Sequence, residues 1–282
     1  MNYILFNPLA NNGRGSEGLD AVIAAAVARC PGGTPVLADV TKEDAAALLM
    51  GLSPQDEAIV CGGDGTLHFL INDLDGAVPA APVYVWRMGT GNDFLRDVLG
   101  KKKQQMVLLN PYLENIPTAE VNGRRLRFIN NVSFGLDGQT CELGEQEKAR
   151  LGRPVNYIFV ALRLLFRDYQ PARASVTVDG ETREYKDVWV ASAFNGRYVG
   201  GGMMLAPGQD RKSDKLCCVV LHSLSRPRAL LNIAKVLWGG HVKMKECDVR
   251  FGHEIEISFD RPMGNNLDGE PTERVAHYHA EK

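Results

Sequence analysis

The sequence predicts an α/β protein with two domains, a Rossmann-like N-terminal α/β domain and a C-terminal antiparallel domain that resembles a β-sandwich. The first hundred residues alternate short apolar runs with helix-like segments, which is the pattern of a parallel sheet covered by helices. After Pro111 the pattern changes to short strands joined by tight turns. The chain has 282 residues, of which 45% are hydrophobic, so it contains enough apolar material for two cores.

The N-terminal domain is expected to span residues 1–112. Its strands are predicted at residues 3–7, 35–38, 58–61 and 83–86, where short apolar runs end in turn-forming residues. Helices are predicted over residues 16–29, where Ser16 is placed to cap the first turn, and over residues 41–50, where Thr41 and Asp44 are candidate caps.

The second domain is expected to span residues 113–270, and residues 271–282 are expected to return to the first domain. The dipeptides Asn122-Gly123 and Asp179-Gly180 favour two-residue hairpins. Further strands are predicted at residues 188–194, 215–222 and 254–259, with helices at about 155–166 and 228–237. These elements indicate a mostly antiparallel domain.

Composition excludes some functional classes. The formal net charge of -2 and a pI near 6.3 lack the basic field of a dedicated nucleic-acid-binding protein, so we expect no nucleic-acid partner. Six cysteines without a CxxC pair, and a chain that begins with a strand-like segment, predict reduced thiols and a cytoplasmic location. No apolar stretch reaches the ~20 residues that span a bilayer, so any contact with a membrane is expected to be peripheral.

Three glycine-rich turns follow successive predicted strands. They are residues 7–15, residues 87–94, and the sequence Gly62-Gly63-Asp64-Gly65-Thr66. Glycines allow the backbone to approach a phosphate, a helix N-terminus favours an anion, and Asp64 can bind a magnesium ion that bridges phosphate oxygens. Because the carboxyl ends of parallel strands meet at one crevice, the three turns predict one shared phosphate-bearing ligand. Neither a Walker A loop nor a dinucleotide fingerprint is present.

The order of three motifs resembles the catalytic family of diacylglycerol kinases, which includes bacterial lipid kinases and sphingosine kinases. The motifs are GGDGT at residues 62–66, GTGNDF at 89–94 and LDGE at 267–270. Similar stretches lie at residues 130–137 and 200–207, so the resemblance covers nearly the whole chain. It implies an enzyme that binds ATP and Mg²⁺ in a cleft between the two domains and phosphorylates a lipid hydroxyl.

The resemblance also implies roles for individual residues. Asp268 matches the proposed general base, Glu270 would support the metal or the base, and Asp93 would link the two domains. We therefore expect Asp268→Asn to remove most turnover while sparing folding. The residues expected to contact the nucleotide are Asn7, Arg14, Thr41, Gly63, Asp64, Gly65, Thr66, Thr90 and Asn92.

Relatives carry a further magnesium loop after an Ala-Pro motif, which corresponds here to residues 206–216. Asp214 and the carbonyl group of Leu216 are the candidate ligands. Lys215 replaces a glycine in this loop, and cations stand at positions 211 and 212. These substitutions suggest the hypothesis that a lysine ammonium group supplies the charge of the metal.

The acceptor is less defined by the sequence than the nucleotide. The apolar residues 155–166 are a candidate lipid-facing helix, although the same spacing is more often part of a core. Diacylglycerol is the default acceptor, delivered from the inner face of the membrane, and homodimerisation is left open. A kinase for a soluble acceptor such as NAD, and a nucleotide- or lipid-binding regulator without catalysis, remain alternatives; retained Asp64, Asp93 and Asp268 argue against the regulator.

Overall fold

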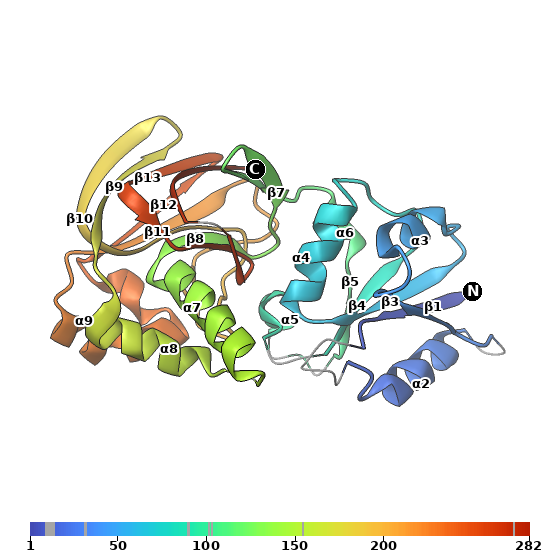
Figure 1. Cartoon of the computed structure of the whole chain (residues 1–282). Coiled ribbons are helices and arrows are strands. Elements are labelled where there is room, and N and C mark those ends of the chain that lie inside the picture. The colour runs from blue at the N-terminus through green and yellow to red at the C-terminus, as the bar shows by residue number, and fades with distance from the viewer. Residues whose placement is uncertain are drawn as a thin grey trace. The chain divides into compact units, whose positions relative to one another are not determined.

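The computed structural model describes residues 1–8, 15–30, 33–88, 91–100, 102, 104–153, 155–272 and 274–282. The chain divides into two compact units, Met1–Ile116 and Pro117–Lys282 (Figure 1). The expected boundary after residue 112 therefore lies four residues too early, because the short helix α6 (Asn110–Leu113) still belongs to the first unit.

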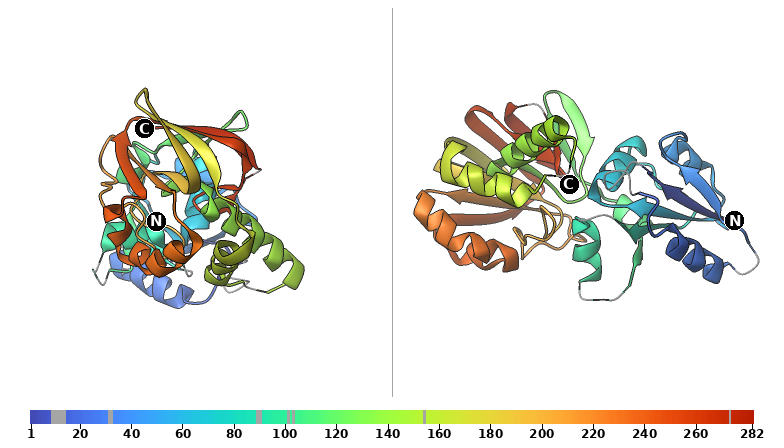
Figure 2. Two further views of the ribbon diagram at one scale, coloured as in Figure 1. Left: turned by 90° about the vertical axis from the view of Figure 1, so that its left-hand side faces the viewer. Right: turned by 60° about the horizontal axis from the view of Figure 1, so that its bottom comes forward.

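The first unit is a sheet with strand order β2-β1-β3-β4-β5, in which all pairs are parallel except β4 with β5. Helix α2 covers one face, and α3 and α4 lie on the other, as Figures 1 and 2 show. The elements are β1 (Asn2–Phe6), α2 (Leu19–Arg29), β2 (Val36–Asp39), α3 (Ala45–Gly51), β3 (Glu57–Gly62), α4 (Asp64–Asp73), β4 (Val83–Arg87), α5 (Asp93–Leu99) and β5 (Met106–Leu108). The predicted Rossmann-like arrangement is confirmed.

Two predicted helices begin later than expected, for local reasons. Helix α2 begins at Leu19, because Gly18 takes a left-handed conformation at the cap position, so Ser16 is not the cap. Helix α3 begins after Asp44, whose side chain accepts a hydrogen bond from the backbone nitrogen of Ala47 at 2.9 Å. The Asp44 cap is therefore confirmed, and Thr41 lies in the preceding turn.

The second unit is an antiparallel sheet with strand order β15-β14-β8-β10-β9-β13-β16-β6-β7, and β11 and β12 continue it from β10. Its strands are β6 (Thr118–Val121), β7 (Arg124–Arg127), β8 (Asn131–Gly135), β9 (Ala172–Val178), β10 (Glu181–Phe194), β11 (Leu216–His222), β12 (Cys247–Gly252), β13 (Glu254–Met263), β14 (Asn265–Leu267), β15 (Glu270–Pro271) and β16 (Val275–Glu281). Its helices are α7 (Leu136–Leu151), α8 (Tyr157–Arg163), the π-helix η1 (Leu164–Asp168), α9 (Arg226–Asn232), and the 3-10 helices η2 (Ile233–Trp238) and η3 (Gly240–Lys243).

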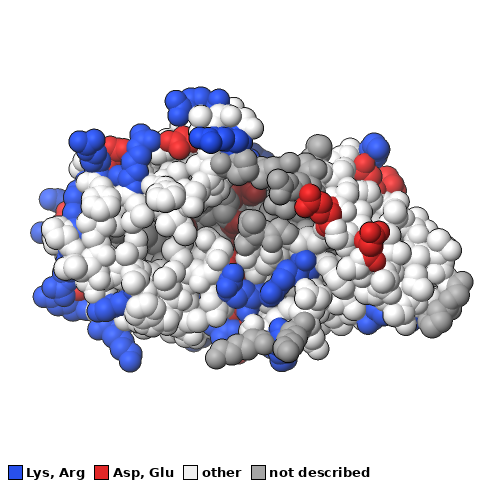
Figure 3. Space-filling model, turned by 90° about the horizontal axis from the view of Figure 1, so that it is seen from below, with Lys and Arg blue, Asp and Glu red and all other residues white. Residues whose placement is uncertain are grey.

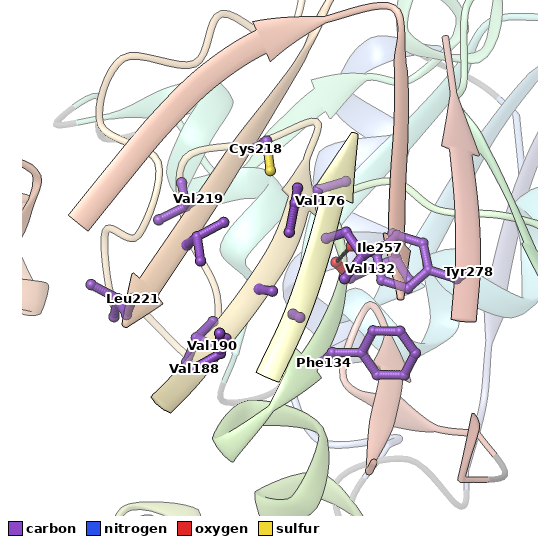
Figure 4. Close-up of a cluster of buried hydrophobic side chains, with 14 of the residues drawn as sticks. Val132, Phe134, Val176, Val188, Val190, Cys218, Val219, Leu221, Ile257 and Tyr278 are labelled. Carbon is purple, nitrogen blue, oxygen red and sulfur yellow. Dashed lines mark hydrogen bonds between the residues drawn. The ribbon is translucent and has the colours of Figure 1, made fainter. Parts of the chain in front are cut away.

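The sheet of the second unit folds over a core of buried side chains. Phe134 of β8 contacts the ring of Tyr278 of β16 at 4.9 Å between centroids and that of Phe259 of β13 at 5.2 Å, although these strands are not neighbours in the sheet. Figure 4 shows Phe134 and Val132 beside Tyr278 and Ile257. The sheet therefore packs against itself as the predicted sandwich.

The expectation for residues 271–282 is wrong. Strand β16 pairs with β13 and β6, so this segment belongs to the sheet of the second unit. Ile257 of β13 and Tyr278 of β16 are fully buried, and this burial explains why the segment completes its own sheet.

The hairpin predictions from dipeptides are confirmed. Both residues of Asn122-Gly123 and of Asp179-Gly180 have positive φ, as a type I′ turn requires. All six cysteines are free, and burial raises the pKa of Cys61 and Cys218 to about 12, which keeps these thiols protonated. Within the described ranges, no helix combines the length and apolarity needed to cross a bilayer.

Gly138→Ala should destabilise the second unit. A Cβ atom at this position of α7 would lie 2.6 Å from the backbone nitrogen of Asn265, and closer still to the carbonyl group of Gly264. Because backbone atoms cannot yield easily, we expect a loss of about 1–3 kcal/mol of unfolding free energy. Gly51→Ala is the control, since a Cβ atom there meets nothing within 4 Å. Equal melting temperatures for the two variants would contradict the packing of α7 on β14.

Candidate functional site

The candidate residues of the first unit gather at the carboxyl ends of its parallel strands. Asn7 follows β1, Thr41 follows β2 and Gly63 follows β3. The hydroxyl group of Thr41 donates to Asp39, the last residue of β2, at 2.7 Å, which holds the turn against the strand end. The parallel pairing of β1 with β2 and β3 therefore brings these carboxyl ends to one edge of the sheet, and the shared ligand predicted there stays a prediction. The roles of these residues toward a nucleotide remain predictions, and Arg14 and Thr90 lie outside the described residues.

Asp64 joins two of the glycine-rich turns. One carboxylate oxygen accepts from the backbone nitrogen of Asp93 at 2.8 Å, and the other from that of Phe94 at 3.0 Å. These residues open α5, and Asn92 at its cap position has a left-handed conformation and makes no capping bond with its side chain. Asp64, from the preceding turn, therefore caps α5. Sequence reasoning assigned Asp64 to a metal and missed this bond, which joins residues 29 positions apart.

The glycines of these turns are required by close contacts. A Cβ atom on Gly62 would collide with the side chain of Thr66, and one on Gly91 would lie 2.9 Å from a carboxylate oxygen of Asp64. Gly65 lies in the first turn of α4, whose N-terminus begins directly after β3. The glycine pattern therefore serves the packing of the turns as well as any approach to a ligand.

Asp93 is buried and lies in the first turn of α5. Its carboxylate is 3.9 Å from the guanidinium group of Arg96, one turn later in the same helix. An acid at a helix N-terminus is stabilised by the helix dipole. The expected link from Asp93 to the second domain stays a prediction.

In the second unit, Asp268 occupies a tight turn between β14 and β15 and is bound to another segment by three hydrogen bonds. One carboxylate oxygen accepts from the backbone nitrogen of Ile129 at 2.8 Å; the other accepts from those of Asn130 at 2.7 Å and Asn131 at 3.1 Å. Asp268 and Gly269 both have positive φ, and Asp268 is 7% exposed. The hairpin interpretation and the candidate-base interpretation therefore apply to the same residue, whose carboxylate is oriented by the fold.

The hydrogen-bond acceptors of Ile129 and Asn130 are also bound by side chains. The buried guanidinium group of Arg211 donates to the carbonyl oxygen of Ile129, and to the side-chain oxygen of Asn130 at 2.8 Å. The side chain of Asn195 donates to the same Ile129 carbonyl at 3.0 Å. Asp268 and Arg211 thus bind opposite sides of one peptide segment. Sequence reasoning noted a cation at position 211 but did not place it here.

Lys282 extends this network. Its ammonium group donates to the side-chain oxygen of Asn195 at 2.7 Å and to the carbonyl oxygen of Arg211 at 2.9 Å. Burial lowers the pKa of Lys282 to about 8, and the charge of Arg211 adds to the decrease, whereas Asp210 and Asp214 oppose it. The ammonium group therefore remains mostly protonated at neutral pH and acts as an internal cation of this loop.

The candidate metal loop, residues 206–216, lies within the described part of the chain. Asp214 is exposed, and Leu216 is fully buried at the start of β11. Two cationic side chains hold the loop by hydrogen bonds: Arg211 donates to Asn130, and Lys282 donates to the carbonyl oxygen of Arg211. Among the residues that the structure describes, no group of three or more His, Cys, Asp or Glu side chains could hold a metal. Asp214 and the carbonyl group of Leu216 stay predicted ligands, and the hypothesis that a lysine ammonium group supplies the charge of the metal stays a hypothesis, for which Lys282 is a candidate beside this loop.

Glu270 is half-buried in β15, a strand that contacts α7. Burial raises the pKa of Cys141 of α7, and the carboxylates of Asp137, Glu270 and Glu145 add to the increase. Asp137 also accepts from the side chain of Asn266 at 3.1 Å. Acids of α7 and β15 thus lie near one another, and α7 contacts both strands that flank the turn with Asp268.

Comparisons with known proteins match both units. A family model of the diacylglycerol kinase catalytic domain matches residues 2–119, and one described as the YegS C-terminal NAD kinase beta sandwich-like domain matches residues 130–279. A probable lipid kinase (YegS-like) of Pseudomonas fluorescens is 30% identical over 76% of this chain and 70% of its own length. A diacylglycerol kinase of Mycobacterium tuberculosis is 26% identical over 72% of this chain and 66% of its own length. A crystal structure of a diacylglycerol kinase from Bacillus anthracis superposes with a TM-score of 0.66 and 20% identity, covering 99% of this chain and 92% of that chain, and so shares the fold.

Asp268→Asn should lower stability, a result that differs from the expectation drawn from the sequence. The new amide group would place N–H donors against at least one backbone N–H of residues 129–131, so a buried donor would lose its acceptor. We expect a loss of about 1–3 kcal/mol of unfolding free energy. Exposed Asp214→Asn is the matched control and should change stability by less than about 0.5 kcal/mol. Urea denaturation measures both, and an unchanged Asp268→Asn midpoint would contradict the three hydrogen bonds.

Asp137 should make stability fall as the pH rises. Burial raises its pKa above the ordinary value, although hydrogen bonds from Asn266 and Ser133 act in the opposite direction. Between the pKa of Asp137 in the unfolded chain and its higher pKa in the folded chain, the folded chain therefore binds more protons. The contribution of Asp137 to stability is largest below the unfolded pKa and is lost as the pH rises through the folded pKa. Asp137→Asn should remove this decrease and gain stability relative to the wild type from pH 4 upward. Parallel stability curves for the two proteins would show that Asp137 does not titrate in this way.

Proposed function

The chain belongs to the family of lipid kinases with a diacylglycerol kinase catalytic domain, which are phosphotransferases with an alcohol acceptor, and from this premise we propose that it transfers the γ-phosphoryl group of ATP to a lipid hydroxyl. Diacylglycerol is the first candidate acceptor, and phosphatidic acid is then the product. The reaction takes place at the inner face of the membrane, which a cytoplasmic protein reaches by peripheral contact.

The observation that carries the proposal is the orientation of Asp268. A carboxylate that three backbone amides hold in a tight turn cannot rotate away, so it presents a fixed acceptor for a proton. Phosphoryl transfer to an alcohol passes through a loose transition state, in which alignment matters most and the proton leaves late. A positioned carboxylate can accept the proton in that step. Asp268 takes the proton of the lipid hydroxyl while the hydroxyl oxygen bonds to the γ-phosphorus and the bond from that phosphorus to the bridging oxygen of the departing ADP breaks.

The strand ends of the first unit form the nucleotide site in this proposal. The segment Gly63–Thr66 begins α4, whose free backbone amides and positive dipole end favour phosphate oxygens. The carboxylate of Asp64, fixed by the N-terminus of α5, is the candidate to hold Mg²⁺, which would neutralise phosphate charge. Asn7, Thr41 and Asn92 border the same edge, where they are placed to contact the rest of the nucleotide.

The choice of diacylglycerol rests on the names of relatives. Two curated mycobacterial proteins at 26% identity are named diacylglycerol kinases, whereas others are named only as lipid kinases. Acyl pockets select by size and apolarity, so other lipid alcohols fit the same chemistry.

A second candidate is a kinase for a soluble acceptor. The model that matches residues 130–279 is described as resembling the NAD kinase β-sandwich, and the strand-end chemistry of the first unit does not define an acceptor. A regulator without catalysis is disfavoured, because Asp64 and Asp268 are each held in a defined orientation.

The direct test is transfer of labelled γ-phosphate from ATP with Mg²⁺. Mixed micelles would contain diacylglycerol, phosphatidylglycerol, ceramide or undecaprenol, and a parallel series would contain soluble acceptors including NAD. We expect label in an organic extract with diacylglycerol, and a loss of at least about a hundredfold in Asp268→Asn assayed well below its melting temperature. Asp260→Asn, which changes an exposed carboxylate of β13 that has no assigned role, should keep the wild-type rate.

Each other outcome has a defined meaning. Label on a soluble acceptor alone would move the protein to the second candidate, and label on another lipid would replace diacylglycerol while keeping the reaction. Wild-type turnover in folded Asp268→Asn would refute the assignment of the base.

A further inference from the structure

Two neighbouring helical segments of the second unit expose large apolar side chains. Arg226 at the start of α9 donates to the carbonyl oxygens of Leu165 and Tyr169 at 2.6 Å, so α9 is joined to the end of η1. Figure 1 shows α8 and α9 on the same side of this unit. The most exposed apolar residues here, which we call the α8/α9 surface, are Ile158, Phe159, Phe166, Leu231, Leu237 and Trp238, each between 57% and 83% exposed.

These segments are apolar on both faces. In α8 and η1, Val160 and Leu164 are buried in the core of the unit, whereas Ile158 and Phe159 point to solvent at 63% and 70% exposure. A helix that only covers a core carries polar residues on its outer face. Phe159 and Trp238, at 60% exposure, are side chains typical of the membrane interface. The outer face therefore has the composition of a surface that is covered by something else.

Cations predominate around this surface. Residues 152–168 and 224–246 together contain eight Lys and Arg and only two acids, Asp168 and Glu246, in a chain with 32 Lys and Arg and 34 Asp and Glu. Some are neutralised, since Arg163 pairs with Glu147 and Arg228 with Glu246. Figure 3, viewed from the side of α8 and α9, shows a largely uncharged area of this unit with Lys and Arg at its margin.

The sign of the charge distinguishes between occupants. A symmetric dimer through this surface would place two sets of cations against each other, which is unfavourable. The surface of a bilayer with anionic lipids attracts Lys and Arg, and its interface accepts Phe, Leu and Trp side chains. The observed combination is therefore complementary to anionic lipid.

We propose that the α8/α9 surface docks the protein onto an anionic lipid bilayer, with the apolar side chains entering the interface and the surrounding cations contacting headgroup phosphates. The inference rests on the proposed function in that docking brings the enzyme to its lipid acceptor. It explains why residues 155–166 supply both core side chains and exposed ones.

Binding to vesicles tests the proposal. The full chain would be sedimented with vesicles of phosphatidylcholine, with or without phosphatidylglycerol, at low and high salt. We expect binding to the anionic vesicles that weakens with salt. Phe159→Ser with Trp238→Ser should weaken it about tenfold or more, because two side chains lose their burial in the interface. Arg167→Glu with Lys235→Glu should weaken it at least about tenfold at low salt.

Matched controls change the same residue types elsewhere in the unit. Phe251→Ser replaces a 45% exposed aromatic residue of β12, and Arg124→Glu with Arg173→Glu reverses two exposed charges. Both controls should bind vesicles as the wild type does. Melting temperatures would confirm that all variants are folded.

The activity readout separates the docking from the proposed function. The surface variants should keep the wild-type rate on short-chain diacylglycerol dissolved as monomers, and lose rate on long-chain diacylglycerol in anionic vesicles. A wild type that does not bind anionic vesicles, or surface variants that bind like the controls, would overturn the docking. A dimer that the surface variants dissociate without a change in vesicle binding would overturn it too and assign the surface to a second copy. Surface-dependent binding without phosphorylation of any lipid would uphold the docking and refute the proposed function.

Discussion

Hydrogen bonds from backbone amides to carboxylates hold the candidate residues within each unit. Asp268 binds three consecutive amides of residues 129–131, and Asp64 binds the first two amides of α5. In each case the acid stands in a glycine-containing turn and fixes a segment distant in sequence. Because the loss of such an acceptor by a buried amide lowers the free energy of unfolding, the turns keep one geometry. The acids expected to perform chemistry therefore also maintain the shape around them.

Local sequence signals predicted much of the fold and the position of the site residues in their elements. The strand ends of the first unit, the Asn122-Gly123 hairpin and the Asp44 cap depend on conformations that one or two residues decide. Gly62 illustrates the limit of such reasoning. Its identity was visible in the sequence, but the reason for it, the contact with Thr66, required coordinates.

The parts that sequence could not predict depend on long-range contacts. The C-terminal strand β16 pairs with β13 and β6, and nothing within residues 271–282 indicates which sheet it joins. Arg211 reaches Ile129, 82 positions away, and Lys282 reaches Asn195, 87 positions away. The sequence showed that a cation at position 211 departs from the metal loop of relatives, but it did not show which group this cation binds. Arg211 and Lys282 thus order the loop around position 211 by hydrogen bonds within the protein.

The central claim is that a carboxylate oriented by the fold takes the proton of a lipid hydroxyl and so directs the γ-phosphoryl group of ATP to that hydroxyl. The most direct measurement compares the ADP released with the phospholipid formed during steady turnover on diacylglycerol micelles. The account predicts one phosphatidic acid for each ADP, and almost no ADP when lipid is omitted. Release of ADP at the same rate with and without lipid would contradict it, because the site would then activate water and not a lipid alcohol.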